Sequence, residues 1–275
     1  MTVTTTTGVS NSMPFVVWQW CDGGKICWDP AGNFYYVTDS PNLYKVPAGS
    51  STPQLLATHS GTPTPNFNQV LYGPDGNLWL SDYAGCNLVK FNLNSNTFSV
   101  QKSLNNPPLG MAWSPDQQTL FIVGGAVYKY DRGTDTMTGP LAGSPITNRS
   151  VVCDVQGNAY FTSGNTQKIH KIASGSVAIT NFVNLGVPPM GLGIDPTNNL
   201  YFQWGGKVTK FNIATPAASS TVATGLDTNG YHNLLYRDAD GMLYSLFPGG
   251  PNIGRVNPST NASASWVTTA ARAAF

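Results

Sequence analysis

Four ionisable side chains are candidates for chemistry in a chain where charged residues are scarce. Only 10% of its residues are Asp, Glu, Lys or Arg, against roughly 25% in an average soluble protein. His232 suits a general acid or base, because an imidazole with an ordinary pKa of about 6.5 exchanges protons at neutral pH. Arg149 and Lys25 suit contacts with substrate oxygens, and Asp22 suits orienting His232 or acting as a base. A structural role inside the fold is the alternative for each of them.

Aromatic residues in the same stretches of sequence suit the wall of a small-molecule pocket. The predicted substrate-binding residues are Trp18, Trp20, Phe67, Asp82, Tyr83, Trp204, Tyr231 and Phe247. Asp82 shares with Asp22 the possible role of orienting the imidazole. Packing between elements of the fold is the alternative for every aromatic residue in this set.

The elements that must position these residues are sequence repeats. The stretch WDPAGNFYY at 28–36 has a counterpart, YGPDGNLWL, at 72–80, and four further units follow. Equivalent positions recur about every 42 residues, which is a propeller-like period; they are 33, 77, 119, 158, 199 and 242. Each unit contains an apolar strand, a turn, an aromatic strand, an alternating strand and a last strand. Four short strands per repeat predict one blade of a β-propeller.

The sequence therefore predicts an all-β fold, a six-bladed β-propeller of four-stranded antiparallel blades around a central channel. We expect one domain over 1–275, with blades at 24–60, 67–104, 108–143, 148–184, 189–225 and 232–270. Glu is absent, while Gly and Pro number 29 and 20, so a helical bundle is excluded. Segments 14–20 and 263–269 both have the pattern of a last strand. One of them completes the sixth blade and the other adds an outer edge, and the sequence leaves open which does which. In either arrangement 14–20 assists ring closure.

A propeller brings loops from distant parts of the sequence to one end of its channel. The loops that enter the innermost strands and the loops that join second to third strands share that end. All the predicted site residues lie in these two sets of loops, so we expect them to converge there. The loop sequences also differ from blade to blade, which favours one asymmetric pocket over a site repeated in every blade.

Three strands carry a resemblance to a known family. They are PLGMAW at 108–113, PMGLGI at 189–194 and the GNLW type of second strand at 76–79. Over about residues 14–270 the chain resembles NHL-type six-bladed propellers, most closely the branch that contains virginiamycin B lyase. The gluconolactonase and strictosidine-synthase groups are similar at a greater distance. Since this fold hosts many activities, the resemblance implies the fold more strongly than the function.

The resemblance also bears on metals. The lyase branch implies a magnesium site that uses glutamates beside a catalytic His, and the gluconolactonase group implies Glu, Asn and Asp ligands. This chain has no Glu, and its third innermost strand begins Leu109-Gly110 where the latter group has Asn-Gly. We therefore expect no catalytic metal and no cofactor, while a structural cation held in the channel by backbone carbonyls stays open. Only His232 could match the lyase group's catalytic residue.

Two classes of function remain after this reasoning. The first is a cofactor-independent enzyme of lyase, isomerase or cyclase type that acts on a natural-product-like small molecule of secondary metabolism. Aromatic walls would hold such a substrate in a reactive shape. The alternative is a lectin or other small-ligand-binding propeller without catalysis. The high content of Thr and Asn and the low content of charged residues favour this alternative.

Composition limits the partners. The net charge is +1 with scattered basic residues, which argues against nucleic acid. No stretch reaches the roughly 18 apolar residues that span a membrane, and the N-terminus lacks a signal-peptide pattern. We expect a soluble monomer with a small-molecule partner, in a compartment that stays open. The four cysteines show no C-x-x-C spacing, and buried apolar roles are favoured over disulfides.

Overall fold

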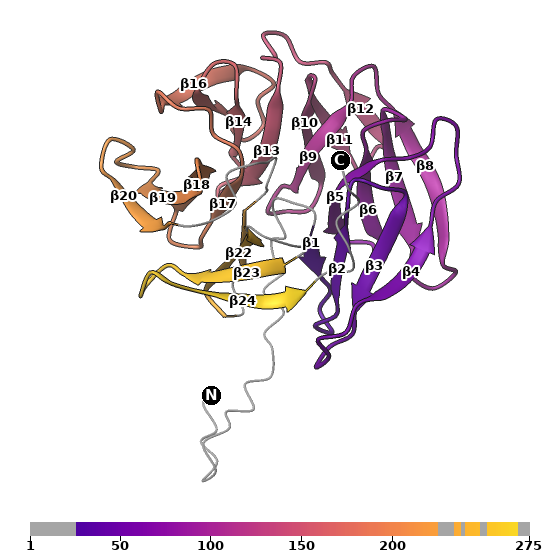
Figure 1. The fold of residues 1–275 in the computed structure, drawn as a ribbon. Helices are drawn as coiled ribbons and strands as arrows, with labels where there is room; N and C mark the ends of the chain where they lie inside the picture. The colour runs from indigo at the N-terminus through magenta and orange to yellow at the C-terminus, as the bar shows by residue number, and fades with distance from the viewer. Residues whose placement is uncertain (1–25, 225–233, 238–239, 248–251, 269–275) are drawn as a thin grey trace, which may run out of the picture.

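Six four-stranded antiparallel sheets form a ring in the computed structural model, which describes residues 26–224, 234–237, 240–247 and 252–268. The sheets follow one another in chain order from indigo to yellow (Figure 1). All the described elements are strands. The prediction of an all-β, six-bladed propeller is confirmed. No helix among the described residues is long and apolar enough to cross a membrane.

Each blade is built from four consecutive strands, of which the first is innermost. Blade 1 contains β1 (Ile26–Trp28), β2 (Phe34–Val37), β3 (Asn42–Val46) and β4 (Gln54–Thr58). Blade 2 contains β5 (Phe67–Tyr72), β6 (Leu78–Asp82), β7 (Asn87–Asn92) and β8 (Thr97–Ser103). Blade 3 contains β9 (Pro108–Trp113), β10 (Thr119–Gly124), β11 (Val127–Asp131) and β12 (Thr136–Thr138).

The second half of the chain repeats this arrangement. Blade 4 contains β13 (Asn148–Cys153), β14 (Ala159–Ser163), β15 (Lys168–Ile172) and β16 (Ile179–Asn184). Blade 5 contains β17 (Leu192–Ile194), β18 (Asn199–Trp204), β19 (Lys207–Asn212) and β20 (Ser219–Ala223). Blade 6 contains β21 (Leu235–Arg237), β22 (Met242–Phe247), β23 (Asn252–Asn257) and β24 (Ala262–Thr268).

Blade 6 is completed by the C-terminal strand, which answers one question that the sequence left open. β24 pairs with β23 as its fourth strand, while segment 14–20 lies outside the described residues. Every blade is therefore continuous in sequence. The blade 6 to blade 1 junction includes an edge-on contact between Tyr244 and Trp28, whose ring centroids lie 4.8 Å apart.

A hydrogen-bonded turn joins the first two strands of the blades. In blade 4 the Asp154 carboxylate accepts bonds from the backbone N–H and the side-chain amide of Asn158, at 2.8 and 2.7 Å, and from the Tyr160 hydroxyl at 3.1 Å. Asp29 in blade 1 and Asp195 in blade 5 receive the same three bonds. Short polar side chains that bond nearby backbone favour such turns. The repeated Asp, Asn and Tyr positions thus have a folding role.

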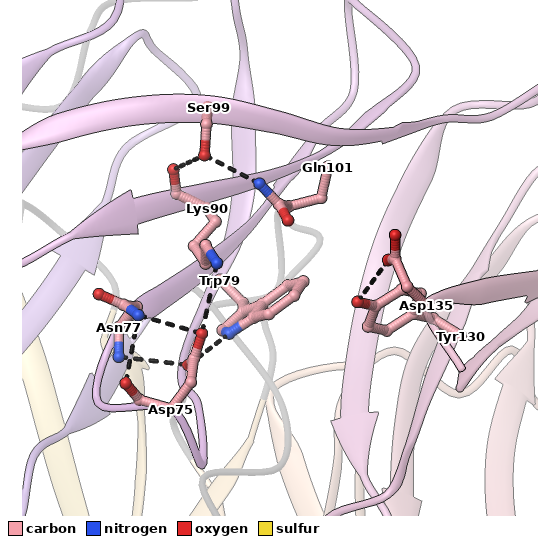
Figure 2. Close-up of polar contacts among 8 residues, drawn as sticks. All are labelled: Asp75, Asn77, Trp79, Lys90, Ser99, Gln101, Tyr130 and Asp135. Carbon is pink, nitrogen blue, oxygen red and sulfur yellow. Dashed lines mark hydrogen bonds and ion pairs between the residues drawn. The ribbon is translucent and has the colours of Figure 1, made fainter. Parts of the chain in front are cut away.

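Blade 2 uses a variant of this turn, shown in Figure 2. The Trp79 indole replaces the tyrosine and donates to Asp75 at 3.0 Å, beside bonds from Asn77. Lys90 lies 3.6 Å from the same carboxylate and 5.5 Å from the centre of the indole ring. Burial acts to raise the pKa of Asp75, but hydrogen bonds from Trp79 and Asn77 outweigh it and keep that pKa below its ordinary value.

A cation stands opposite the second-strand aromatic in all six blades. The cross-strand pairs are Tyr35–Lys45, Trp79–Lys90, Phe121–Lys129, Tyr160–Lys171, Tyr201–Lys210 and Tyr244–Arg255. In the five lysine pairs the ammonium lies 5.5–5.8 Å from the ring centre. Each contact of this kind is worth roughly 0.5–1 kcal/mol at exposed sites. Five of the scarce basic residues therefore lie over an aromatic ring of their own blade.

Neighbouring blades come close together at their innermost strands. The side-chain amide of Gln69 bonds both the backbone N–H and the carbonyl of Met111 in the next blade. The Leu192 N–H donates to Ser150 Oγ at 3.0 Å, which joins blade 5 to blade 4. A Cβ at Gly110 would lie 2.6 Å from the Arg149 carbonyl oxygen, so only glycine permits this approach of blades 3 and 4.

Candidate functional site

The two ends of the ring differ, and each has a structural definition. We call the entry end the one where the innermost strands begin and the second-to-third-strand hairpins lie. The turn end is the opposite one, where the Asp turns lie. Because all blades run the same way, predicted site residues from blades 2, 4 and 5 meet the entry end from different parts of the chain.

Blade 4 enters the ring through an irregular segment that carries Arg149. The pairing of β13 with β14 shifts register between Asn148 and Val151. Thr147, just before the strand, has a φ of 60°, which is unusual for a β-branched residue. β-bulges commonly re-aim side chains near functional sites. Arg149 Nε lies 3.8 Å from a Cβ built at Gly164, so its guanidinium lies against the β14–β15 hairpin.

Asn148 fixes the start of this segment. Its side chain is fully buried, and its Nδ2 donates to the carbonyl of Gly124 in blade 3 at 3.1 Å and to that of Pro145 at 2.5 Å. Ser150, on the other side of Arg149, is held to blade 5 by the bond to Leu192. Arg149 is thus carried by backbone that is anchored to both neighbouring blades, which favours a defined position.

Trp204 is the exposed aromatic of blade 5. It ends β18 next to a tight hairpin of Gly205 and Gly206, with φ values of 54° and 73°. The side chain is 38% exposed, whereas Trp28, Trp79 and Trp113 are buried. Packing between blades therefore does not account for Trp204 among the described residues. An exposed indole at a channel mouth is suited to stacking on a ligand.

The predicted residues of blade 2 divide into two groups. Tyr83 is 43% exposed at the entry end. Phe67 is fully buried and stacks on His59 and Phe98, with ring centroids 5.9 and 5.7 Å apart. Phe67 thus takes part in packing between blades 1 and 2.

Asp82 has structural partners in the structure. Its Oδ1 accepts the backbone N–H groups of Asn66 and Gly85 at 3.0 and 3.1 Å, and Oδ2 accepts from Asn87 at 3.5 Å. The side chain is buried. These bonds shape the two loops of blade 2, so contact with a substrate stays a prediction for Asp82.

Half of the predicted site lies outside the described residues. Those positions are Trp18, Trp20, Asp22, Lys25, Tyr231 and His232. Phe247 is the last residue of β22, at the entry end, and its backbone alone is described. The structure therefore brings Arg149, Trp204, Tyr83 and Asp82 to one end of the ring.

Two lysines at the entry end were not singled out from the sequence. Lys168 begins β15 and Lys207 begins β19, directly opposite Trp204. The signal that could have located Lys207 is its place immediately after the Gly205-Gly206 hairpin, which faces the entry end.

Charges at the entry end are separated by sign among the described residues. Asp39 and Asp82 lie on blades 1 and 2, whereas Arg149 and Lys168 lie on blade 4 and Lys207 on blade 5. The other described acids lie at the turn end: Asp29, Asp75, Asp116, Asp131, Asp135, Asp154, Asp195 and Asp240. The entry end of blades 4 and 5 is therefore a positively charged region within the described structure.

His170 is a buried imidazole with a packing role. It stacks on Phe161 with ring centroids 5.3 Å apart, and its Nε2 lies 3.0 Å from Thr166 Oγ1. Burial, and then the nearby charge of Lys168, lower the pKa of His170 below its ordinary value. The imidazole is thus neutral at pH 7, as expected for a residue between blades.

Metal ligands do not gather in the described part of the chain. Within the described ranges, no three His, Cys, Asp or Glu side chains form a group that could hold an ion. Asp240 accepts bonds from the Met242 N–H and the Tyr244 hydroxyl at 3.1 and 2.5 Å. It serves the turn of blade 6.

The geometry defines a six-bladed β-propeller with one irregular end. No family model matches the sequence, and no curated protein matches it. Among solved structures, a chain of a nidogen/laminin complex has a TM-score of 0.71 at 13% identity and covers 86% of this chain and 94% of that one. Virginiamycin B lyase from Staphylococcus aureus has a TM-score of 0.66 at 14% identity, covering 92% and 86%. TolB from Acinetobacter baumannii has a TM-score of 0.65 at 15% identity, covering 86% and 64%.

These similarities are similarities of fold. The resemblance to virginiamycin B lyase-like propellers, expected from the sequence, is confirmed at that level. At this identity the chain shares an architecture with a lyase, with TolB and with a chain of a nidogen/laminin complex, and one fold can host such different proteins. Function has to be argued from the entry end.

Proposed function

We propose that the protein is a cofactor-independent enzyme of lyase, isomerase or cyclase type, with one small-molecule site at the entry end of the channel. The natural-product-like substrate would lie against Trp204 and Tyr83, with Arg149 contacting an oxygen. His232 is the proposed acid/base, and Lys25 and Asp22 are its proposed companions. We further propose that the protein acts as a monomer.

The contrast between the two ends of the ring carries this proposal. The residues that repeat from blade to blade have contacts that support the fold: the Asp carboxylates accept bonds from their own turns and the lysines lie over rings. The entry end instead carries different side chains in each blade. A lectin with one site per blade would need repeated ligand-binding groups, so the pattern favours one asymmetric site.

The chemistry needs positioning and a proton shuttle only. Elimination, isomerisation and cyclisation are redox-neutral, and each can proceed by removing a proton at one atom and returning one at another. A cation beside the reacting oxygen would stabilise the negative charge that develops there. An aromatic wall would restrict the substrate to a reactive conformation. The scarcity of ionisable residues is compatible with this demand.

A mass-balance assay tests the reaction class. The full chain is incubated with a panel of natural products, without added cofactor, and the products are separated and weighed by mass spectrometry. An isomerase or cyclase leaves the substrate mass unchanged, and a lyase yields fragments whose masses add up to it. A gain of one water would identify a hydrolase instead and would contradict the proposal.

Substitution then tests the site. His232→Ala is expected to lower turnover by about 10²–10⁴-fold, the usual contribution of an acid/base, with the fold retained. Arg132→Gln, at the turn end, is the matched control and should leave turnover unchanged. Glycan binding at several equivalent blades, indifferent to His232→Ala, would favour the lectin.

A further inference from the structure

We propose that the ligand is an acid: Arg149 and Lys207, at the entry end between blades 4 and 5, bind its carboxylate or phosphate while Trp204 covers an apolar ring. This inference rests on the proposed function, because it names the substrate class of the same site. It commits to a small amphiphilic anion with a planar apolar part.

The first support is the sign of the charge. Arg149, Lys168 and Lys207 all lie at the entry end of blades 4 and 5. The described acids of these two blades, Asp154 and Asp195, lie at the turn end and accept bonds from their own turns. No ion pair joins Lys168 or Lys207 to an acid in the described residues. Cations gathered at a low-dielectric mouth attract an anionic ligand.

The lysines at the entry end of blades 4 and 5 can be compared with the other lysines by their contacts. The other lysines with ammonium contacts in the described residues lie against an aromatic face, an acid or a carbonyl: Lys129, for example, donates to the Ser176 carbonyl at 2.8 Å. The lysines at the entry end of blades 4 and 5 therefore differ from the repeated ones in their surroundings.

The register places Trp204 and Lys207 on one face of blade 5. They are direct cross-strand partners, so their side chains leave the sheet on the same side. Phe202, two residues before Trp204, belongs to the same buried cluster as Val152 and Tyr160 of blade 4. Because alternate residues of a strand share a face, Trp204 and Lys207 lie on the face of blade 5 that meets blade 4.

Arg149 lies on the facing blade. Its guanidinium is beside Gly164, in the β14–β15 hairpin of blade 4, and the following residue, Ser150, bonds blade 5 directly. We place the ligand across the entry end of the two blades, with its anionic group held by Arg149 and Lys207.

The apolar side of this mouth supports an amphiphilic ligand rather than a bare inorganic ion. Trp204 is exposed, and so is Ile146, whose carbonyl accepts the Ser163 hydroxyl at the end of β14. Exposed indole and aliphatic surface beside guanidinium and ammonium groups match a ring that carries an acid. The guanidinium can bind either a carboxylate or a phosphate in bidentate fashion.

Calorimetric titration of the full chain with matched probes tests the inference. The acids are benzoate, indole-3-acetate and phenyl phosphate; the neutral counterparts are benzamide and indole-3-acetamide; inorganic phosphate is the bare ion. We expect at least one acid to bind about tenfold more tightly than its amide, because a charge-assisted hydrogen bond is roughly twice as strong as a neutral one. Comparing benzoate with phenyl phosphate separates carboxylate from phosphate preference.

Three variants locate the binding. Arg149→Gln and Lys207→Gln should each weaken acid binding about five- to tenfold and leave amide binding unchanged. Trp204→Ala should weaken acids and amides alike. Arg132→Gln, of the same charge change at the turn end, should have no effect, and thermal unfolding of each variant checks the fold.

The outcomes separate the inference from the proposed function. Acids that bind no tighter than amides, no binding by any acid, or acid binding indifferent to both Arg149→Gln and Lys207→Gln overturns the inference. If Trp204→Ala still weakens amide binding in that case, the proposed entry-end site stands with a neutral substrate. Charge-dependent acid binding without conversion of any natural product supports the inference and counts against the enzyme.

Discussion

At the turn end, blades 1, 4 and 5 present the same Asp, Asn and Tyr with the same three hydrogen bonds. At the entry end, the corresponding strands begin with a buried Asn in blade 4, a stacked Phe in blade 2 and a Pro in blade 3. One end is thus a repeated solution to making a turn. The other end has different chemistry in each blade.

The difference separates the residues that the fold requires from the residues that a binding site would require. A propeller needs six similar blades to close its ring, so residues that make a blade recur. A site on the channel axis is met by each blade from another direction, so its residues need not recur. Substitutions at the turn end should therefore change stability, and those at the entry end should change binding.

Asp154→Ala should have the largest effect on stability. Asp154 accepts four hydrogen bonds, from the backbone of Gln156 and Asn158, the Asn158 amide and the Tyr160 hydroxyl. Each buried donor left without a partner costs about 1–3 kcal/mol. We expect a loss of roughly 3–5 kcal/mol in the free energy of unfolding, measured in urea.

The repeat itself supplies the control for this experiment. Asp116 occupies the turn of blade 3 but is exposed, and its bonds come from Ser114 and Gln118 while the strand aromatic, Phe121, has no hydroxyl. Asp116→Ala should cost about 1 kcal/mol or less, as expected for an exposed turn. Equal losses in the two variants would show that the turns are not graded by burial.

Gly110→Ala should lower both stability and ligand binding, unlike the other substitutions. The new Cβ would meet the Arg149 carbonyl oxygen at 2.6 Å, and backbone cannot move aside cheaply. Overpacking of this kind costs about 1–3 kcal/mol. Because the atom displaced belongs to Arg149, we expect weaker binding of acids as well as lower stability.

Gly164→Ala is the matched control for Gly110→Ala. Its Cβ would have only ordinary contacts, 3.7 Å from Thr147 Oγ1 and 3.8 Å from Arg149 Nε. Stability should stay within about 0.5 kcal/mol of the parent chain, the usual range for changes away from special features. A Gly110→Ala variant as stable as Gly164→Ala would mean that blades 3 and 4 are not closely held.

The sequence predicted the fold from the turn end, whereas the site at the entry end stays a prediction. The repeat of Asp, Asn and an aromatic is local: each bond joins residues two to six positions apart, so composition and spacing reveal it. The second-strand aromatics were visible for the same reason. Strand number, order and the six blades followed from that regularity.

The entry end depends on relations between blades, which spacing along the chain does not encode. Phe67 and Asp82 were proposed for the pocket, yet their partners are His59 and Phe98 for the ring and Asn66 and Gly85 for the carboxylate. The β13 register shift and the positive φ of Thr147 have no local sequence signal. Lys207 was not predicted, because its place opposite Trp204 follows from the strand register.

Tyr201→Phe should have a smaller effect and a characteristic pH dependence. The Tyr201 hydroxyl donates to Asp195 at 2.9 Å, and burial, followed by the charge of Asp195, raises the pKa of Tyr201. Losing this bond should cost about 1–3 kcal/mol at pH 7. Since the folded state disfavours tyrosinate, the contribution is fully present below a pH of about 10 and is lost as the pH rises above it.

Urea unfolding at pH 7, 9 and 10.5 measures this effect. The parent chain should lose stability between pH 9 and 10.5, and Tyr201→Phe should lose less over the same interval, because one buried hydroxyl no longer titrates. Tyr83→Phe, which removes an exposed hydroxyl at the entry end, should behave like the parent chain. An unchanged slope in Tyr201→Phe would contradict the assignment.

Substitution of His170 should have the smallest effect on stability. Because its folded-state pKa is lowered, the neutral imidazole is preferred in the folded chain. The unfolded chain therefore binds more protons below a pH of about 6.5, and stability falls as the pH drops below that value. His170→Gln should retain a polar partner for Thr166 and flatten the profile of unfolding free energy between pH 7 and 5.

Lys168→Gln should raise the pKa of His170 towards its ordinary value. NMR titration of the imidazole protons measures this change. A His170 pKa that does not respond to Lys168→Gln would contradict the contribution of Lys168 and would leave burial as the cause of the shift.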